Sequence, residues 1–162
     1  DGEDALTSAV TEWLGGCTNV ADLFSGLGTF AFALARTAQV TAAEGARDAV
    51  LACNAAAKRY GVKVTAQHRD LFRNPLLADE LNRFAAVLLD PPRAGAREQV
   101  ERIAESAVAR VVYISCNPAS WAKDARTLVD AGFVLKELRP VGQFRWSTHV
   151  ELASLFVRGD KP

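Results

Sequence analysis

The sequence contains no methionine and only three cysteines, Cys17, Cys53 and Cys116, which are an odd number with no closely spaced pair. This spacing argues against a disulfide framework and against a cysteine metal cluster. The two histidines lack the spacing of metal ligands, so we expect no metal site. A reducing cytoplasm is the compartment that fits this cysteine usage best. A chain without methionine that begins at Asp1 is expected to be part of a longer protein.

An excess of charge of either sign is also absent, because lysine plus arginine and aspartate plus glutamate both total 19. Proteins that bind nucleic acid over a broad surface usually carry a basic excess, so any polyanion must be held by a local patch or by another part of the protein. No window approaches the ~20 apolar residues of a membrane-spanning helix. The 162 residues, 49% of them hydrophobic, suffice for one domain around one core.

Apolar runs alternate with segments of helical period, a pattern typical of βαβ units and a parallel sheet. Strands are expected near residues 19–24, 40–44, 62–68, 85–90 and 111–115, and helices near 28–36, 46–60, 97–109 and 120–131, with another before Gly15 and a short one near 75–82. Two further strands, near 133–141 and 150–158, are joined by a loop and can therefore pair antiparallel. The expected fold class is α/β, a doubly wound, mostly parallel seven-stranded sheet with a C-terminal antiparallel hairpin.

The segment D-L-F-S-G-L-G-T-F at residues 22–30 joins a predicted strand to a predicted helix. Gly26 and Gly28 let the backbone approach a ligand closely, and the amide groups of such a turn can meet a carboxylate or a phosphate. Ala31 stands where a dinucleotide-binding fingerprint has its third glycine. The loop therefore favours a cofactor without a pyrophosphate.

Acidic residues follow the next two predicted strands. Glu44 ends a strand about twenty residues after the loop, where an acid can accept hydrogen bonds from both ribose hydroxyls. Asp70 follows the third strand and is expected to reach an adenine amino group. An ordinary helix cap or an exposed strand end is the alternative for each acid.

Three further groups suggest where a reaction takes place. D-P-P-R at residues 90–93 resembles the D-P-P-[YF] motif of amino-methyltransferases, except that Arg93 replaces a base-stacking aromatic. Cys116, just past an apolar strand, is a candidate nucleophile, and a small buried hydrophobe is the alternative. Glu151 is a candidate base or, alternatively, a solvent-facing strand residue, and His149 is a candidate hydrogen-bonding residue that positions the substrate.

These residue types suit methylation at carbon 5 of a pyrimidine. That carbon is a poor nucleophile until a thiolate adds to carbon 6, and a base must later remove the carbon 5 proton so that the thiolate can leave. Cys116, Arg93 and Glu151 supply a nucleophile, a stabiliser of the developing oxyanion and a base. Arg93, Arg97, Arg139 and Arg145 are candidates for the mouth of this site.

The motifs together resemble the RNA uracil-5-methyltransferases, which have the Rossmann-like class I S-adenosylmethionine-dependent fold. The resemblance rests on the glycine loop, on D-P-P-R-x-G at 90–95, on Y-I-S-C-N-P at 113–118 and on the segment 144–151. It implies Cys116 as nucleophile, Glu151 as base, Asp90 and Arg93 beside the uracil, and S-adenosyl-L-methionine as cofactor. The loop and the resemblance give these cofactor contacts: Phe24, Ser25, Gly26, Gly28, Thr29, Glu44, Asp70 and Asp90.

The resemblance covers nearly all of residues 1–162 but only the catalytic domain of the family. The upstream region, which in the family carries an RNA-binding OB-like domain and sometimes an iron–sulfur cluster, has no counterpart in this sequence, so we expect the RNA substrate to be recognised mainly through it. Local departures also occur. P-V-G-Q-F-R at 140–145 lacks the family's usual acid and proline, Ser25 replaces a common cysteine, and Ala119-Ser120 replaces a threonine pair.

The sequence predicts S-adenosylmethionine-dependent methylation of carbon 5 of uridine in ribosomal or transfer RNA through a covalent adduct at carbon 6. One alternative is RNA cytosine-5 methylation, which also uses a cysteine after the fifth strand. Those enzymes usually carry a second cysteine after the fourth strand, where this chain has Pro91 and Pro92. Another alternative is a cofactor- or RNA-binding module without turnover, against which the presence of Cys116 and Glu151 counts.

Overall fold

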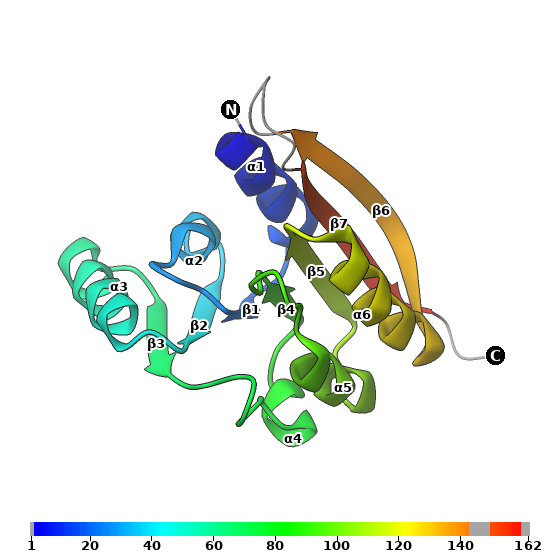
Figure 1. Ribbon diagram of the computed structural model, residues 1–162. Coiled ribbons are helices and arrows are strands. Elements are labelled where there is room, and N and C mark those ends of the chain that lie inside the picture. The colour runs from blue at the N-terminus through cyan, green and yellow to red at the C-terminus, as the bar shows by residue number, and fades with distance from the viewer. Residues whose placement is uncertain (1, 143–149, 160–162) are drawn as a thin grey trace.

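The computed structural model describes residues 2–142 and 150–159, which form one seven-stranded sheet with helices on both faces (Figure 1). The strands are β1 Asn19–Leu23, β2 Gln39–Glu44, β3 Val64–His68, β4 Ala86–Leu89, β5 Arg110–Ser115, β6 Phe133–Gly142 and β7 Val150–Arg158. The helices are α1 Gly2–Leu14, α2 Thr29–Leu34, α3 Arg47–Tyr60, α4 Ala78–Leu81, α5 Arg97–Glu105 and α6 Pro118–Asp130.

The strand order is β3-β2-β1-β4-β5-β7-β6, and the first five strands are parallel. β1 lies inside the sheet and pairs with both β2 and β4, so the order of the strands reverses between β1 and β4. In such sheets ligands bind in the crevice outside the carboxyl ends of the strands at the point of reversal. The predicted fold class is confirmed, and the glycine loop, which follows β1, lies at this crevice.

The C-terminal hairpin confirms the predicted antiparallel pairing and adds an arrangement that the sequence did not indicate. β7 lies between β5 and β6 and runs antiparallel to both (Figure 1). Ser115 pairs with Leu152, so the first residues of β7 lie beside the last residue of β5. Glu151 is therefore carried to the same edge of the sheet as the segment that bears Cys116.

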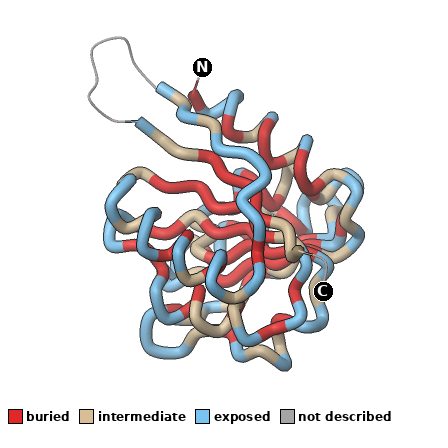
Figure 2. Tube along the Cα trace, turned by 90° about the vertical axis from the view of Figure 1, so that its right-hand side faces the viewer, coloured by how far each residue is buried: buried red, intermediate tan, exposed pale blue. Residues whose placement is uncertain are grey.

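The core has two layers, one on each face of the sheet, and the strands form the buried centre (Figure 2). Apolar residues of α1, α2 and α3 pack on one face, and those of α4, α5 and α6 pack on the other. Trp13 belongs to the first layer, as expected from the sequence, with 5% of its surface exposed. Its indole N–H donates to a Glu137 carboxylate oxygen at 2.8 Å.

One predicted helix is too long, because α5 ends at Glu105 rather than at residue 109. Ser106 adopts an extended conformation, and its hydroxyl donates to the Ile103 carbonyl while accepting from the Val108 N–H. The next amide, that of Ala107, donates to the side chain of Asn82. These contacts satisfy the helix end and turn the chain into β5. No helix in the described ranges is long and apolar enough to cross a membrane.

Candidate active site

The glycine loop turns sharply because three of its residues have left-handed backbone conformations, Phe24 at φ 62°, Gly26 at φ 57° and Gly28 at φ 91°. This conformation costs about 1–2 kcal/mol for a residue with a side chain, so a phenylalanine there is unusual. Such strain clusters at functional sites. A Cβ atom at Gly28 would lie 2.9 Å from the Cys53 sulfur, which leaves room only for glycine.

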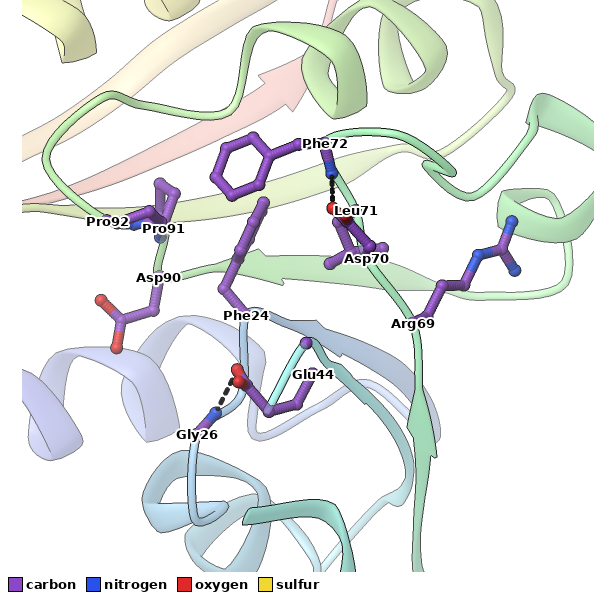
Figure 3. Close-up of a pocket in the computed structure, with 11 residues that line it drawn as sticks. Phe24, Gly26, Glu44, Arg69, Asp70, Leu71, Phe72, Asp90, Pro91 and Pro92 are labelled. Atoms are coloured by element: carbon purple, nitrogen blue, oxygen red, sulfur yellow. Dashed lines mark hydrogen bonds between the residues drawn. The ribbon is translucent and has the colours of Figure 1, made fainter. Parts of the chain in front are cut away.

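The loop forms one side of a pocket of about 380 Å³ at the carboxyl ends of the strands (Figure 3). Five predicted cofactor contacts line it, namely Phe24, Gly26, Glu44, Asp70 and Asp90. Six further lining residues were not predicted: Gly45, Arg69, Leu71, Phe72, Pro91 and Pro92. The rings of Phe24 and Phe72 lie against each other with centroids 5.4 Å apart, which gives the pocket an aromatic wall.

Two of the three predicted acids of the pocket, Glu44 and Asp70, also hold local backbone. Glu44 accepts hydrogen bonds from the Gly26 N–H at 3.1 Å and from the Ala46 N–H at 2.8 Å, so it ties the glycine loop to the start of α3. One oxygen of Asp70 accepts from the Phe72 N–H at 3.0 Å and so caps the turn that follows β3. A carboxylate oxygen can accept more than one hydrogen bond, so these contacts are compatible with ligand binding.

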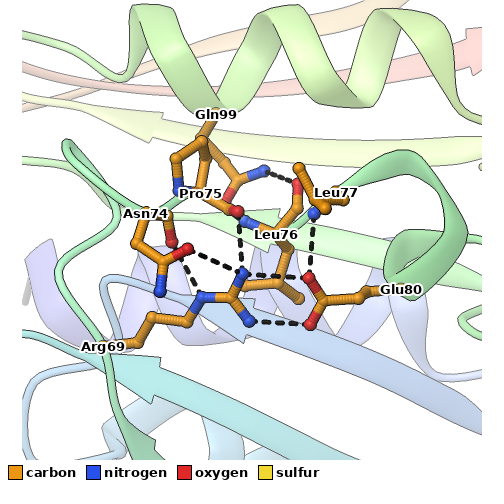
Figure 4. A network of polar contacts seen from close by, with 7 residues as sticks. All are labelled: Arg69, Asn74, Pro75, Leu76, Leu77, Glu80 and Gln99. Atoms are coloured by element: carbon orange, nitrogen blue, oxygen red, sulfur yellow. Dashed lines mark hydrogen bonds and ion pairs between the residues drawn. The ribbon is translucent and has the colours of Figure 1, made fainter.

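The segment after β3 is held by a polar network centred on Arg69 (Figure 4). The guanidinium donates to both Glu80 oxygens, at 2.7 and 2.9 Å, and to the carbonyls of Asn74 and Pro75. The buried side chain of Gln99 bonds both the N–H and the carbonyl of Leu76. This network fixes the chain that carries Asp70, Leu71 and Phe72 into the pocket. The sequence offered no signal for it beyond the residue types.

Two carboxyl groups near the loop are strongly perturbed. Asp22, at the end of β1, is fully buried, and within the described residues neither of its oxygens has a hydrogen-bond partner. Burial raises the pKa of Asp22 well above its usual range, and the charges of Asp90 and Glu44 add to this. Burial and the charge of Glu151 raise the pKa of Asp90 to about 7. Ionisation of both carboxyl groups is therefore unfavourable in this part of the structure.

A second, smaller pocket of about 230 Å³ shares Asp90 with the first. Its other lining residues are Glu3, Leu6, Thr29, Phe30, Ile114 and Glu151. Thr29, predicted as a cofactor contact, thus lies on this side of Asp90. Of the remaining predicted contacts, Ser25 and Gly28 line neither pocket. Asp90 forms a common wall between the cofactor pocket and a chamber that contains the candidate base.

Cys116 is half-buried directly after β5, and the D-P-P-R loop is fastened beside it. The Arg93 carbonyl accepts hydrogen bonds from the Asn117 side-chain amide at 3.0 Å and from the Ser120 hydroxyl at 2.8 Å. These bonds bring the two motifs together, although Cys116 lines neither pocket and the Arg93 side chain faces a separate groove. His149 and Arg145 lie outside the described residues.

A buried acid that the sequence did not single out supports this junction. Asp124 of α6 accepts hydrogen bonds from the Tyr113 hydroxyl at 2.5 Å and from the Ala96 N–H at 2.8 Å. A Cβ atom at Gly95, which has φ 84°, would lie 3.0 Å from an Asp124 oxygen. Asp124 thus joins β5, α6 and the loop after Pro92, and Gly95 permits the close approach.

The pocket fits S-adenosylmethionine in shape and charge. The left-handed turn at Gly28 gives close backbone access, the aromatic wall suits an adenine, and Glu44 ends β2 where a ribose can be held. Asp90, which lines the pocket, is partly buried close to the negative charge of Glu151, and the cofactor carries a sulfonium and an ammonium cation. Neutralising crowded carboxylates with a cationic ligand is favourable in a poorly solvated site.

Comparison with solved structures defines the class of the protein. Magnesium protoporphyrin IX methyltransferase from Synechocystis, 18% identical, matches with a TM-score of 0.76 over 98% of this chain and 84% of its own. The tRNA (uracil-54, C5)-methyltransferase of Pyrococcus abyssi, solved with S-adenosyl-L-homocysteine, matches with a TM-score of 0.83 and 27% identity, over 96% of this chain and 38% of its own. The chain has the S-adenosylmethionine-dependent methyltransferase fold.

The sequence comparison identifies the family within that class. Residues 5–158 match the tRNA (uracil-5-)-methyltransferase family, and the chain belongs to it. An uncharacterized RNA methyltransferase of Zymomonas mobilis is 55% identical over 98% of this chain and 40% of its own length. The 23S rRNA (uracil(1939)-C(5))-methyltransferase of Pseudomonas fluorescens is 39% identical over 94% of this chain and 34% of its own. The chain thus spans well under half the length of these relatives.

Proposed function

We propose that this chain is the catalytic part of an enzyme that methylates carbon 5 of uridine in RNA. The observation that carries the proposal is the shared position of Asp90, which lines both the pocket beside the glycine loop and the chamber of Glu151. A methyl donor bound in the first pocket and a uracil ring bound at the second pocket can then meet beside the Asp90 side chain. Family membership supports uracil rather than cytosine as the base.

Cys116 begins the reaction by adding its thiolate to carbon 6 of the uracil, which places negative charge on the oxygen at carbon 4. Asp90 lines both pockets and would therefore lie beside the ring on which this charge develops. The Arg93 loop is fastened beside Cys116, and its guanidinium, which lines the neighbouring groove, would have to turn toward the ring to offer a cation for this charge. The bound cofactor supplies an electrophilic methyl group for carbon 5.

Glu151 completes the cycle by taking the proton from carbon 5. The electrons of that C–H bond form the carbon 5–carbon 6 double bond, the bond between carbon 6 and sulfur breaks, and the Cys116 thiolate is restored. Support for this role is the pairing of Ser115 with Leu152, which brings the start of β7 to the end of β5. Glu151 also lines the chamber beside Asp90.

The cofactor contacts follow from the first pocket. Glu44 would hold the ribose, Phe24 and Phe72 the adenine face, and Asp70 the adenine edge, while Asp90 would offset the positive charge of the methionine end. Thr29, at the start of α2 and on the far side of Asp90, would contact that end. Ser25 and Gly28 act by shaping the loop.

The test separates the two halves of the covalent cycle. Cys116→Ala should form no protein–RNA adduct that survives denaturation, because the attacking thiolate is absent. Glu151→Gln should accumulate such an adduct, because methyl transfer proceeds but release is slow. Cys17→Ala, a half-buried cysteine remote from the site, is the control and should behave as the unaltered chain.

Product analysis identifies the base. Mass spectrometry of nucleosides from the treated RNA should show 5-methyluridine and no 5-methylcytidine. Equal adduct levels in Cys116→Ala and Glu151→Gln, or 5-methylcytidine as the product, would refute the proposal.

A further inference from the structure

A groove of about 440 Å³ lies between the start of α5 and the first turns of α6, directly beside the segment that bears Cys116. Three exposed cationic side chains line it, those of Arg93, Arg97 and Lys123. None of these three residues lines either of the two pockets already described. The groove is therefore a separate feature at the mouth of the candidate active site.

The acidic groups of the groove already have partners. Asp124 is buried and accepts from Tyr113 and Ala96. Glu101 pairs with Arg97 at 3.3 Å, and both side chains are exposed, by 44% and 82%. An exposed pair spaced i,i+4 contributes little to stability, so an arriving anion can displace Glu101 easily.

Within the described part of the chain, two of the three cations of the groove are not engaged by an acidic side chain. In residues 2–142 and 150–159, neither Arg93 nor Lys123 forms an ion pair. Arg139, which the sequence also suggested for the mouth of the site, instead pairs with Glu12 and Glu137 and covers the Trp13 ring on another face. The groove therefore places two cations, unpaired among the described residues, next to the segment that bears Cys116.

We propose that this groove binds the phosphodiester backbone next to the target nucleotide of an RNA strand. The proposal rests on the proposed function, because a uridine with its carbon 6 at Cys116 must bring its own phosphates to the neighbouring surface. The Asn117 and Ser120 bonds to the Arg93 carbonyl fix the rim of the groove relative to Cys116. A chain of zero net charge thereby gains a local site for a polyanion.

The test measures binding of a fluorescein-labelled decamer of uridine to the 162-residue chain by fluorescence anisotropy between 50 and 300 mM salt. Each phosphate neutralised on a single strand adds about 0.7 to the slope of log K against log salt. Arg97→Gln and Lys123→Gln should each lower the slope by about 0.7 and weaken binding several-fold. The double variant should lower the slope by about 1.4.

Arg126→Gln is the matched control, because Arg126 lies on the same helix, is exposed and lines no part of the groove. Its slope should equal that of the unaltered chain. S-adenosylhomocysteine binding, measured by calorimetry, should be the same in every variant and so confirms that the cofactor pocket is intact. An unchanged slope of log K against log salt in the double variant, or an equal decrease of that slope with Arg126→Gln, would overturn the proposal that the groove binds RNA phosphates.

The same variants, assayed with S-adenosylmethionine and RNA, distinguish the groove from the proposed function. Formation of 5-methyluridine with unchanged slopes refutes the groove and leaves the proposed function standing. Lowered slopes without any 5-methyluridine or covalent adduct support the groove as a phosphate site and refute the proposed function.

Discussion

Replacing Asp90 by asparagine should make the protein more stable above neutral pH while removing activity. The pKa of Asp90 rises from its ordinary value of 3.8 to about 7, chiefly because the group is buried. For an acid whose pKa is higher in the folded than in the unfolded state, folding stability is greatest when the group is protonated in both states. Stability then falls as the pH rises from about 4 to about 7 and stays low above that.

The size of the effect follows from the same values. A difference of about three pH units, at about 1.4 kcal/mol for each, corresponds to about 4 kcal/mol of destabilisation at pH 8. For a chain of 162 residues this equals a change in melting temperature of about 10 °C. Asp90→Asn carries no charge and should lack this loss of stability.

Urea unfolding at half-unit steps from pH 5 to pH 8 measures the effect. In this range Glu80, whose pKa Arg69 holds at about 2, stays ionised and contributes a constant amount. Asp130→Asn, an exposed surface substitution, is the control and should follow the unaltered chain within about 0.5 kcal/mol.

Ligands provide a second readout. Saturating S-adenosylmethionine carries a sulfonium cation, and S-adenosylhomocysteine lacks that charge. S-adenosylmethionine should therefore reduce the loss of folding stability with rising pH more than S-adenosylhomocysteine does. A pH-independent stability of the unaltered chain, or a lower stability of Asp90→Asn at pH 8, would show that the burial of this carboxyl group has been misjudged.

Three other outcomes are expected. S-adenosylhomocysteine should raise the melting temperature, by about 2.7 kcal/mol of added stability at a hundredfold excess over Kd, and Glu44→Ala should largely abolish the rise in a thermal shift assay; a full shift in that variant would mean that the ribose lies elsewhere. Arg69→Met should destabilise the chain by about 3 kcal/mol in urea unfolding, because Glu80 and two carbonyls lose a largely buried partner; a stability equal to that of the unaltered chain would show that the network of Figure 4 is dispensable. Fusing the region upstream of the matching segment of the Zymomonas mobilis relative to residue 1 should raise kcat/KM for RNA strongly, with little change in cofactor affinity; equal rates with and without that region at physiological salt would show that these 162 residues already contain the main RNA-recognition surface.

The sequence predicted the parts of the fold that depend on local periodicity. Alternating apolar runs located the strands, the glycine motif located the crevice at β1, and the missing helix after Gly132 indicated the hairpin. The position of β7 between β5 and β6 was not predicted, because strand order depends on contacts between distant segments. The end of α5 was misplaced because Ser106 stops it through a cap that helical periodicity does not reveal.

The residues of the candidate site fall into the same two groups, those that the sequence motifs predict and those whose role depends on contacts with distant segments. Motif residues such as Glu44 and Asp90 were predicted and do line the pocket, since their positions at strand ends follow from topology. Arg69 and Asp124 were missed because each acts through partners that are remote in the sequence or hidden in the core. The burial of Asp22 could not be foreseen, because a polar residue in a strand is expected to face solvent or a partner.

The antiparallel course of β7 also determines which insertions and deletions this protein can tolerate. Every parallel strand ends at the reacting edge of the sheet, so extra residues in the loops there shift no strand. β7 starts at that edge, and a single residue inserted between Glu151 and Ser154 would turn Glu151 to the opposite face of the sheet. Length variation among natural relatives should therefore be scarce within the first half of β7 and frequent at the opposite end of the sheet, where helices return to the strands.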